Sequence, residues 1–525
     1  MATLKKSTFL IMLFSIVTRI ISFFFKIYLS RRVGAEVLGL FQMAISVFGL
    51  FCTIAASGVP LMLSRKTAEL TALKNREEEL HGVMTGATIL SLAVTLFLIF
   101  GCILFRKKLR FVFSDGRCAD LFFILLPCLI STVMYQLLRG YFMGKGRYFD
   151  YSVTELLEEI IKVVSCLSFL SSAFIALSES VAIAVAFLVT DYAIMTILLI
   201  LYFIKGGRFR KPRGVKMLIR SGLPVTGMRV AAGLISSFIA IALPSALMKG
   251  GLSAGEAAAE YGRAVGMAFS LLFAPLALTS ALSVVILPEA ASLAATGRWE
   301  DLRVRVNNSL LFIFIITVLF YALFLILGEC YGELLFKDVK AGRFISFSAG
   351  MVIPAALSGL LNTTLNSLGE ERKVFLSFLI SALFLVLSVL ILPRFIGIYA
   401  LSVGECGFHL INFVFGMVFL WKKRAYDGRI FRPAAITMAL SFPTALLVKL
   451  SYLPLSKWGS GVFLRAAFPT LVGILVYAGL LLVFRPIPDL KAVLLRHNKK
   501  RAPSHGSKKK LVTRQNHSET ELPIL

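Results

Sequence analysis

Two cationic side chains stand inside an apolar stretch near the start of this sequence, LFSIVTRIISFFFKIYLS, residues 13–30. Arg19 and Lys26 are seven residues apart, so a helix would place both on one face, close to Ser15 and Ser22. A charged side chain costs about 3 kcal/mol at the centre of a membrane helix, so such residues usually face protein or water. The stripe therefore predicts an anion site in a wet cavity. The alternative interpretation is that the two cations snorkel to headgroups or pair with acidic residues.

Further arginines fall inside later apolar runs. Arg229 is the rough counterpart of Arg19 in the second half of the chain, and Arg263 lies near the end of another run. Arginine suits a diphosphate because its planar guanidinium donates two hydrogen bonds at once. We interpret Arg19, Lys26, Arg229 and Arg263 as candidate substrate-binding residues, with pairing to acids as the alternative.

Acidic and amide side chains suggest a second kind of site. Glu405, His409 and Asn412 are spaced i, i+4, i+7, which puts them on one helix face, and Asp191 is a further acid inside an apolar run. These four residues are candidates for coupling transport to Na⁺ or H⁺, and coupling to the membrane potential is also possible. The alternative is a satisfied hydrogen-bond network between helices. No cofactor and no bound metal are expected.

Motifs of enzymes are missing from the sequence. The segment GYFMGKG, 140–146, resembles a phosphate loop, but its spacing is wrong and no Ser or Thr follows the lysine. GYFMG and GRAVG, 262–266, instead favour close helix packing. There is no HExxH motif. The sequence therefore indicates a protein that is not an enzyme.

Composition indicates an all-α, multi-pass membrane protein. The 525 residues are 58% hydrophobic with a mean hydropathy of +0.84, and the net charge is +28. Repeated apolar runs of about 20 residues make membrane lipids, not nucleic acid, the expected partner of this positive charge. The runs predict about fourteen transmembrane helices, near 8–29, 38–62, 83–105, 119–143, 153–177, 181–204, 221–247, 262–288, 308–328, 344–368, 374–393, 397–421, 433–455 and 463–484.

The basic residues also predict an orientation. Most Lys and Arg residues fall in loops on the side of the N-terminus, which places both termini in the cytoplasm. The loop RKKLRFVFSDGR, 106–117, is the exception. A group of charges near the inner end of the fifth predicted helix is interpreted as lying at the membrane interface: Glu155, Glu158, Glu159 and Lys162.

An internal repeat suggests how the helices are grouped. GKGRYFDYS, 144–152, and GEERKVFLS, 369–377, share Gly, Arg and Ser at an offset of 225 residues, with six predicted helices between them. An even number of helices implies two halves in parallel, pseudo-twofold arrangement. We expect five parts: a six-helix lobe over 1–204, a basic cytoplasmic linker over 205–220, a second six-helix lobe over 221–421, two additional helices over 422–484, and a basic disordered tail over 485–525.

Three segments resemble a known family. RVGAEVLGLFQMAISVFGLFCTIAASGVPLMLSRKTAEL, 32–70, and the later YGRAVGMAF and VVILPEAAS are similar to the stage V sporulation protein B family, in the multidrug/oligosaccharidyl-lipid/polysaccharide exporter superfamily. The resemblance implies two lobes arranged as a V around a central cavity. In the lipid II flippase branch that cavity is lined by cations, and Arg19 in TRIISF matches a basic residue of the branch's first helix. The sequence departs from the branch at Ser22, at Lys26 and at Arg263.

The resemblance implies the transport of a glycan linked to undecaprenyl pyrophosphate, from the inner to the outer leaflet, by alternating access. The expected cargo is a lipid II-like peptidoglycan precursor for the spore cortex, and cell-wall synthesis machinery is a possible partner. Two alternatives stay open at this point. One is a cation-coupled exporter of drugs or metabolites on the same fold, and the other is a scaffold of envelope biogenesis that transports nothing.

Overall fold

The computed structural model describes residues 2–484, apart from 57, 74–75, 172–176, 458 and 460. Side chains are described from residue 13 onward, apart from a few positions within 224–228, 278–285 and 457. The predicted basic tail, 485–525, lies outside the described residues. Within the described part of the chain all regular structure is helical. This fits a chain in lipid, where helices satisfy every backbone hydrogen bond internally.

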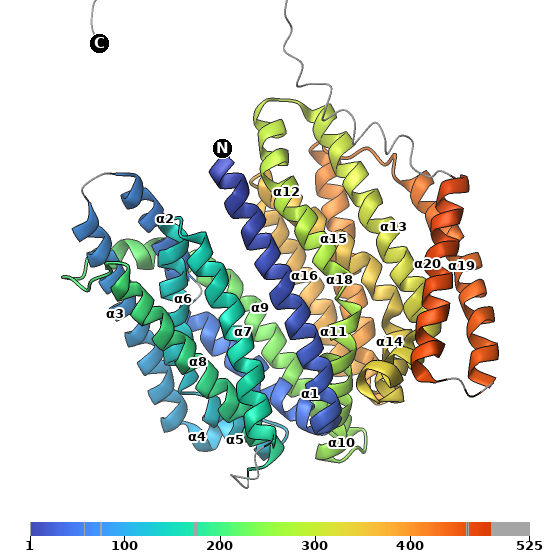
Figure 1. Cartoon of the computed structure of the whole chain (residues 1–525), viewed down its shortest axis with the longest axis horizontal. Helices are drawn as coiled ribbons and strands as arrows, with labels where there is room; N and C mark the ends of the chain where they lie inside the picture. The colour runs from blue at the N-terminus through green and yellow to red at the C-terminus, as the bar shows by residue number, and fades with distance from the viewer. Residues whose placement is uncertain are drawn as a thin grey trace, which may run out of the picture.

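The first half of the chain forms a bundle of apolar helices, on the left of Figure 1. In it α2 packs on α6, and α7 packs on both α8 and α1. The bundle consists of α1 (Ala2–Ala56), α2 (Gly58–Ala72), α3 (Glu77–Leu104), α4 (Arg106–Val112), α5 (Gly116–Leu125), α6 (Cys128–Gly144), α7 (Tyr148–Ser171) and α8 (Glu179–Ile204).

A sharp kink divides α1 into two parts. Gly34 has φ +76° and ψ 177°, a backbone conformation that residues with a side chain rarely adopt, so the helix changes direction there. The kink falls between the predicted transmembrane helices 8–29 and 38–62. The short connection expected between them is therefore a single non-helical residue, and the two apolar runs are joined almost directly.

The second half forms another bundle, in the centre of Figure 1. The helix α9 begins at Val215, so the linker expected to end at 220 ends at Gly214 instead. The bundle consists of α9 (Val215–Lys249), α10 (Ala254–Tyr261), η1 (Gly262–Ala268), α11 (Phe269–Leu272), α12 (Leu276–Ala295), α13 (Trp299–Tyr331), η2 (Gly332–Phe336), α14 (Val339–Ser348), η3 (Ala349–Met351), α15 (Val352–Ser367), α16 (Glu371–Ile391), α17 (Pro393–Ile396) and α18 (Tyr399–Lys422).

Two further helices, α19 (Phe431–Lys457) and α20 (Val462–Phe484), pack on each other and on α13 at the right of Figure 1. Their bounds agree with the predicted helices 433–455 and 463–484 to within a few residues. The beginning of α1 and the end of α20 lie at the upper side of the view. The two bundles diverge toward that side and meet at the lower side. The boundaries of the predicted lobes remain predictions.

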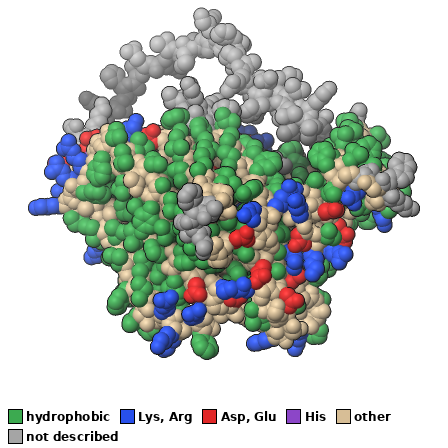
Figure 2. All heavy atoms as spheres, turned by 60° about the horizontal axis from the view of Figure 1, so that its bottom comes forward, with side chains coloured by type: hydrophobic (Ala, Val, Ile, Leu, Met, Phe, Trp, Pro, Cys, Tyr) green, Lys and Arg blue, Asp and Glu red, His purple; other side chains and the backbone are tan. Residues whose placement is uncertain are grey.

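The surface is that of a multi-pass membrane protein. Ten described helices are long and apolar enough to cross a membrane, or eleven if the bent pair α5 and α6 forms one span. The long helix α1 is one of these ten, although it covers two predicted spans. The number fourteen stays a prediction. Figure 2 shows hydrophobic side chains over the flank, with charges of both signs gathered at the lower end. Such a large exposed apolar area is stable against lipid and not against water.

The glycine motifs of the sequence are confirmed as helix-packing sites. A Cβ on Gly140 would lie 2.7 Å from the carbonyl oxygen of Pro60, and one on Gly144 would lie 2.5 Å from that of Ser64. Real Cβ atoms essentially never approach so closely, so α6 can pack on α2 only with glycine at both positions.

Candidate functional site

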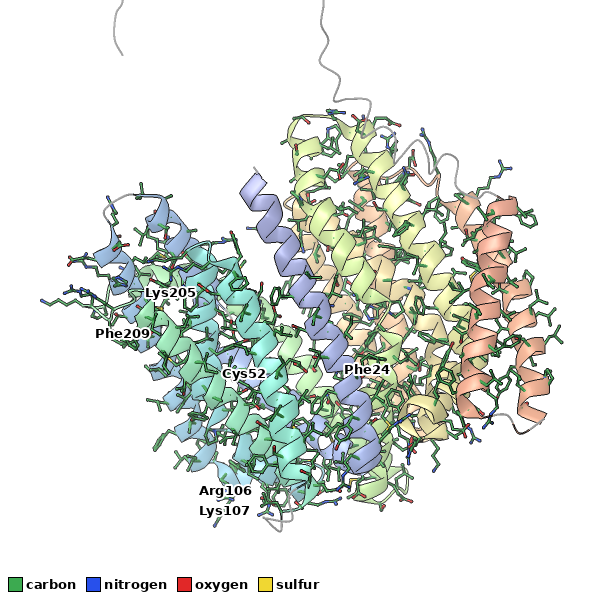
Figure 3. The ribbon with its side chains drawn as sticks, viewed as in Figure 1. Phe24, Cys52, Arg106, Lys107, Lys205 and Phe209 are labelled. Atoms are coloured by element: carbon green, nitrogen blue, oxygen red, sulfur yellow. The ribbon has the colours of Figure 1, made fainter. Side chains whose placement is uncertain are left out.

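A cavity of about 650 Å³ lies between the first part of α1 and the η1–α11 segment of the second bundle. Arg19 and Lys26 both line it from α1, and Ser22 lines it between them. Their seven-residue spacing is two helical turns, so α1 presents both cations on one face, as the sequence predicts. Phe24, which is 63% exposed, lies on the side of α1 that faces the second bundle (Figure 3).

The two cations differ in their surroundings. Within the described part of the chain, neither Arg19 nor Lys26 forms an ion pair. Lys26 lies within electrostatic reach of Glu159 and Lys162 on α7, but Glu159 pairs with Lys162 at 2.8 Å. Positive charge without a fixed counterion in a cavity favours an anionic ligand. The charge of its lining would therefore suit an anionic ligand.

The facing wall of this cavity is aromatic and apolar, contributed by η1, α11 and the residues that follow. Val265, Phe269 and Phe273 form most of it, and the rings of the two phenylalanines are 5.0 Å apart. Ser270 adds a hydroxyl, which donates to the carbonyl of Gly266 at 2.9 Å. One side of the cavity thus suits a charged group and the other suits hydrocarbon.

A second cavity, of about 280 Å³, lies behind that wall and contains Glu405. Val265, Phe269 and Phe273 line both cavities, so three side chains separate an acidic space from a cationic one. The ring of His409 is one helical turn from Glu405, with 3.7 Å between its Nε2 and the carboxylate. The structure therefore brings this pair together, as the spacing predicts.

Asn412, the third residue predicted on this helix face, lies in different surroundings. Asn412 is 2% exposed, accepts a hydrogen bond from Ser377 at 3.1 Å and donates to the carbonyl of Phe408 at 3.0 Å. It thus helps to pack α18 against α16, and among the described residues it does not line the Glu405 cavity. His409 reaches α15 through Ser358, with 3.3 Å between Nδ1 and Oγ.

The two later arginines lie outside the cavity of Arg19 among its described lining residues. Arg263 is held in two ion pairs of 2.8 Å, with Glu260 and with Asp338, and Asp338 also caps the start of α14. Both carboxylates are used to fix η1, so Arg263 acts as a packing residue in this conformation. Arg229 lies on α9 with an exposed side chain.

Asp191 belongs to a polar network inside the first bundle, where it accepts a hydrogen bond from Thr132 at 3.0 Å. A second polar group in this bundle consists of Tyr135, whose hydroxyl donates to Glu158, and Arg139, which donates to that hydroxyl at 2.7 Å. Figure 3 places Cys52, a neighbour of Asp191, within this bundle.

The structure gives partners to the charges of the fifth predicted helix. Glu159 is 6% exposed and pairs with Lys162 at 2.8 Å, and Glu155, whose side chain is 30% exposed, pairs with Arg139 at 3.3 Å. Their position relative to the membrane interface remains a prediction. The roles of Tyr135 and Arg139 were missed because their partners are on other helices. A tyrosine and an arginine four residues apart in an apolar run were the available signal.

The two bundles are tied together at the lower side of Figure 1, which we call the closed end. Arg31, next to the kink, donates to the carbonyl of Leu335 at 2.7 Å and to that of Leu334, both in the second bundle. Its neighbour Arg32 pairs with Glu179 of the first bundle at 3.2 Å. Consecutive arginines thus hold the end of the first transmembrane segment to both bundles.

Glycines allow the closest contact at the closed end. A Cβ on Gly39 would lie 1.9 Å from the carbonyl oxygen of Ala258, and one on Gly262 would lie 2.0 Å from that of Ala35. Here α1 touches α10 and η1 backbone to backbone. The Oγ atoms of Ser114 and Ser245 are 2.7 Å apart across the same end.

Comparison with known proteins begins with a family model. The model of the polysaccharide biosynthesis protein family matches residues 4–289, which is more than half of the chain. Stage V sporulation protein B of Bacillus subtilis (strain 168) is 24% identical over 398 residues, which cover 73% of this chain and 76% of that protein.

Solved structures show the same fold. The lipid II flippase MurJ in its inward closed conformation aligns with a TM-score of 0.68 at 14% identity, covering 94% of this chain and all of that one. An inward-facing multidrug resistance MATE family transporter of the MOP superfamily aligns with a TM-score of 0.66 at 15% identity, covering 78% of this chain and 94% of that one. The expected fold class is thereby confirmed.

Proposed function

This chain belongs to the polysaccharide biosynthesis protein family, and we propose that it is a flippase for a glycan linked to a polyprenyl diphosphate lipid. It would act as a membrane transporter by alternating access, and not as an enzyme. The observation that carries the proposal is the cavity in which Arg19 and Lys26 face an aromatic, apolar wall. A lipid-linked glycan has a diphosphate next to a hydrocarbon chain, and this cavity offers a partner to each.

The proposed movement follows from the closed end. The diphosphate would enter between the diverging ends of the bundles and bind Arg19, whose guanidinium can donate two hydrogen bonds to it. The polyprenyl chain would remain in lipid while the polar glycan occupies the cavity. Release of the ties at Arg31 and Gly39 would then open the opposite side. An equilibrium between two such packed states is the usual basis of alternating access.

The orientation we propose is the one predicted from the basic loops. With both termini in the cytoplasm, the bundles diverge toward the cytoplasm and the closed end faces outward. The cargo would then move from the inner to the outer leaflet of the bacterial plasma membrane. The specific cargo we propose is a lipid II-like peptidoglycan precursor for the spore cortex. The fold shared with a lipid II flippase and the likeness to a stage V sporulation protein support it.

Glu405 is our candidate for coupling. Its cavity shares a wall with the cavity of Arg19, so a proton or cation bound at Glu405 would act on the substrate side through Phe269 and Phe273. Asp191, bonded to Thr132 within the first bundle, is the second candidate. The membrane potential is a further source of energy, because the cavity of Arg19 is positively charged.

A specific observation favours one other function. The acidic cavity of Glu405 would suit a cationic drug or metabolite, and the fold is shared with a MATE transporter. This alternative predicts transport of an organic cation that depends on Glu405 and not on Arg19. A scaffold that transports nothing would depend on neither residue.

The test uses cells that lack their own lipid II flippase. These cells would express the wild-type chain, Arg19→Ala or Lys107→Ala, and lipid II exposed at the outer leaflet would be measured. Lys107 is an exposed cation at the lower end of the first bundle (Figure 3) and serves as the matched control. We expect exposure to be restored by the wild type and the control but not by Arg19→Ala. Failure of the well-expressed wild type would contradict the lipid II cargo.

A further inference from the structure

The segment between α8 and α9 forms a basic and aromatic surface on the first bundle. We call it the linker ledge and define it by Lys205, Arg208, Phe209, Lys211 and Arg213. All five residues are exposed. Figure 3 shows Lys205 and Phe209 at the outer edge of the first bundle, away from the second bundle and from both cavities.

The backbone of the ledge is fixed where it leaves α8. Gly206 has φ +85°, and a Cβ on Gly207 would lie 2.5 Å from the ring of Tyr202. The hydroxyl of Tyr202 donates to the carbonyl of Arg208 at 2.9 Å. The chain therefore turns tightly over this ring and continues in one defined conformation.

The rest of the ledge lies against the beginning of α3. The backbone N–H of Arg210 donates to Thr85 Oγ1 at 3.0 Å, and that of Arg213 donates to the carbonyl of Gly82 at 2.9 Å. A Cβ on Gly82 would lie 2.8 Å from the carbonyl oxygen of Lys211, and one on Gly86 would lie 2.5 Å from that of Arg213. Two glycines one helical turn apart thus form the groove that holds the linker backbone.

This docking uses the backbone and leaves the side chains available. Among the described residues, Lys205, Arg208, Lys211 and Arg213 form no ion pair. Arg210 has one long contact, 3.8 Å to Glu78, and the side chains are 51% and 80% exposed. Four unneutralised cations on an ordered backbone make a site for several negative charges.

Exposed apolar side chains accompany these cations. Phe209 is 43% exposed and Phe203 is 51% exposed, with their rings 5.7 Å apart, and Ile204 beside them is 73% exposed. A soluble anion or a nucleic acid backbone would neutralise the cations but leave this hydrocarbon in water. The interface of a membrane accommodates both, because aromatic rings lie at headgroup depth and Lys and Arg reach the phosphates.

We propose that the linker ledge binds anionic phospholipid headgroups of the adjacent leaflet. The bound lipid would hold the first bundle at a fixed depth in the membrane. The chain leaves the ledge at Gly214, which has φ +71°, and this residue would act as the pivot about which the second bundle moves. This proposal does not depend on the proposed cargo, and its tests do not measure transport.

The first test measures thermal stability of the full chain in detergent while short-chain phosphatidylglycerol or phosphatidylcholine is added. The ledge variant carries Lys205→Gln, Arg208→Gln, Lys211→Gln and Arg213→Gln. The control variant carries Arg106→Gln, Lys107→Gln, Lys108→Gln and Arg110→Gln, the same charge change at the other end of the bundle (Figure 3).

We expect phosphatidylglycerol, and not phosphatidylcholine, to raise the Tm of the wild type and of the control. Each Lys or Arg contributes about fivefold to binding at an anionic surface, so removing four should raise the required phosphatidylglycerol by about 600-fold if the contributions multiply, and by well over about tenfold if they overlap. Equal titrations for the ledge and control variants would overturn the proposal.

The second test places a reporter at the site without removing any charge. Phe209→Trp in nanodiscs would be compared with the wild type, so that the fluorescence of the native tryptophans is subtracted. Spin-labelled phosphatidylglycerol should quench the added tryptophan about twofold more than spin-labelled phosphatidylcholine at the same mole fraction. Equal quenching by the two lipids would overturn the proposal even if the fourfold variant does not fold.

Discussion

Arg19 is the residue on which the proposed site depends most. It combines a position inside an apolar helix, a cavity of about 650 Å³ and no ion pair within the described part of the chain. A charge in this position costs free energy in lipid, and a cavity that admits water and an anion removes most of that cost. Arg263, a predicted substrate-binding cation on η1, differs from Arg19 because its charge is already paired with Glu260 and Asp338.

The first prediction concerns binding of a diphosphate. Arg19→Ala should weaken the binding of farnesyl diphosphate by about 10- to 100-fold, because a hydrogen bond to a charged group contributes about 1.5–3 kcal/mol. The affinity of Arg19→Lys should fall between those of the wild type and Arg19→Ala, since lysine keeps the charge but cannot donate two parallel hydrogen bonds. The measurement is the rise in Tm with ligand concentration, which reports the Kd. An unchanged Kd for Arg19→Ala, with Lys107→Ala as control, would remove Arg19 from the site.

The second prediction concerns Glu405. If this carboxylate couples transport to a cation, Glu405→Gln should abolish the response of the initial rate to an imposed Na⁺ or pH gradient. The affinity for the diphosphate should stay within about twofold, because the amide has nearly the same volume and the Arg19 cavity is beyond the wall. Rates in vesicles with and without each gradient provide the measurement. A full gradient response in Glu405→Gln, together with its loss in Asp191→Asn, would move the coupling site to the first bundle.

At the scale of elements, the closed end depends on how closely α1 approaches α10 and η1. The contact exists because Gly39 and Gly262 have no side chains, so backbone meets backbone. The segment η1 is a π-helix, an irregularity that is frequent at functional sites. It carries Val265, which lines both cavities, so movement at the closed end is linked physically to the substrate side.

The third prediction tests this contact. In a Ser114→Cys/Ser245→Cys background the two sulfurs should form a disulfide in the closed state, because the serine oxygens are 2.7 Å apart. Adding Gly39→Ala should lower the cross-linked fraction several-fold, since overpacking costs about 1–3 kcal/mol and favours separation of the helices.

Gly49→Ala is the control for that experiment. Gly49 lies on the same helix, and a methyl group added there would have no neighbouring atom within 4 Å, so the cross-linked fraction should not change. Equal cross-linking in Gly39→Ala and Gly49→Ala would show that the glycine contact does not control closure.

Most elements could be predicted from sequence, because a bilayer requires long apolar helices and these are visible as runs. The bounds of α19 and α20 were found to within a few residues. A loop of several residues was predicted where the structure has a kink at Gly34 alone. A glycine with charged residues on both sides fits either a loop or a kink. The π-helix was also not predictable, because its sequence GRAVG is equally compatible with an α-helix.

The candidate site was predictable only where it depends on one helix. The spacing of Arg19 and Lys26, or of Glu405 and His409, fixes their shared face. The partners of Arg263, Asp191 and Asn412 are on other helices, and helical periodicity carries no information about which helices meet. The aromatic wall was missed for the same reason, because phenylalanine is common in every apolar run of this chain.

At the scale of the whole molecule, the two bundles meet at one end and diverge at the other. Several charges at the closed end occur in pairs of opposite sign, such as Arg117 with Glu36 at 2.8 Å, whereas the charged residues that line the Arg19 cavity are both cations. Exposed pairs contribute little to stability, about 0–1 kcal/mol each, so such ties can be broken and reformed. This arrangement suits a molecule that opens alternately to each side.

The last prediction concerns transport by the purified protein. Vesicles containing the full chain and a fluorescent polyprenyl-diphosphate-linked glycan would be treated with a reductant that bleaches only the outer leaflet. The fraction of label that becomes accessible over time measures translocation directly. We predict rapid accessibility with the wild type, unchanged rates with Lys107→Ala, and at most about a tenth of the rate with Arg19→Ala, from the loss of one charged hydrogen bond. A wild-type rate equal to that of protein-free vesicles, or an Arg19→Ala rate equal to the wild type, would contradict a flippase that holds its cargo by the cations of α1.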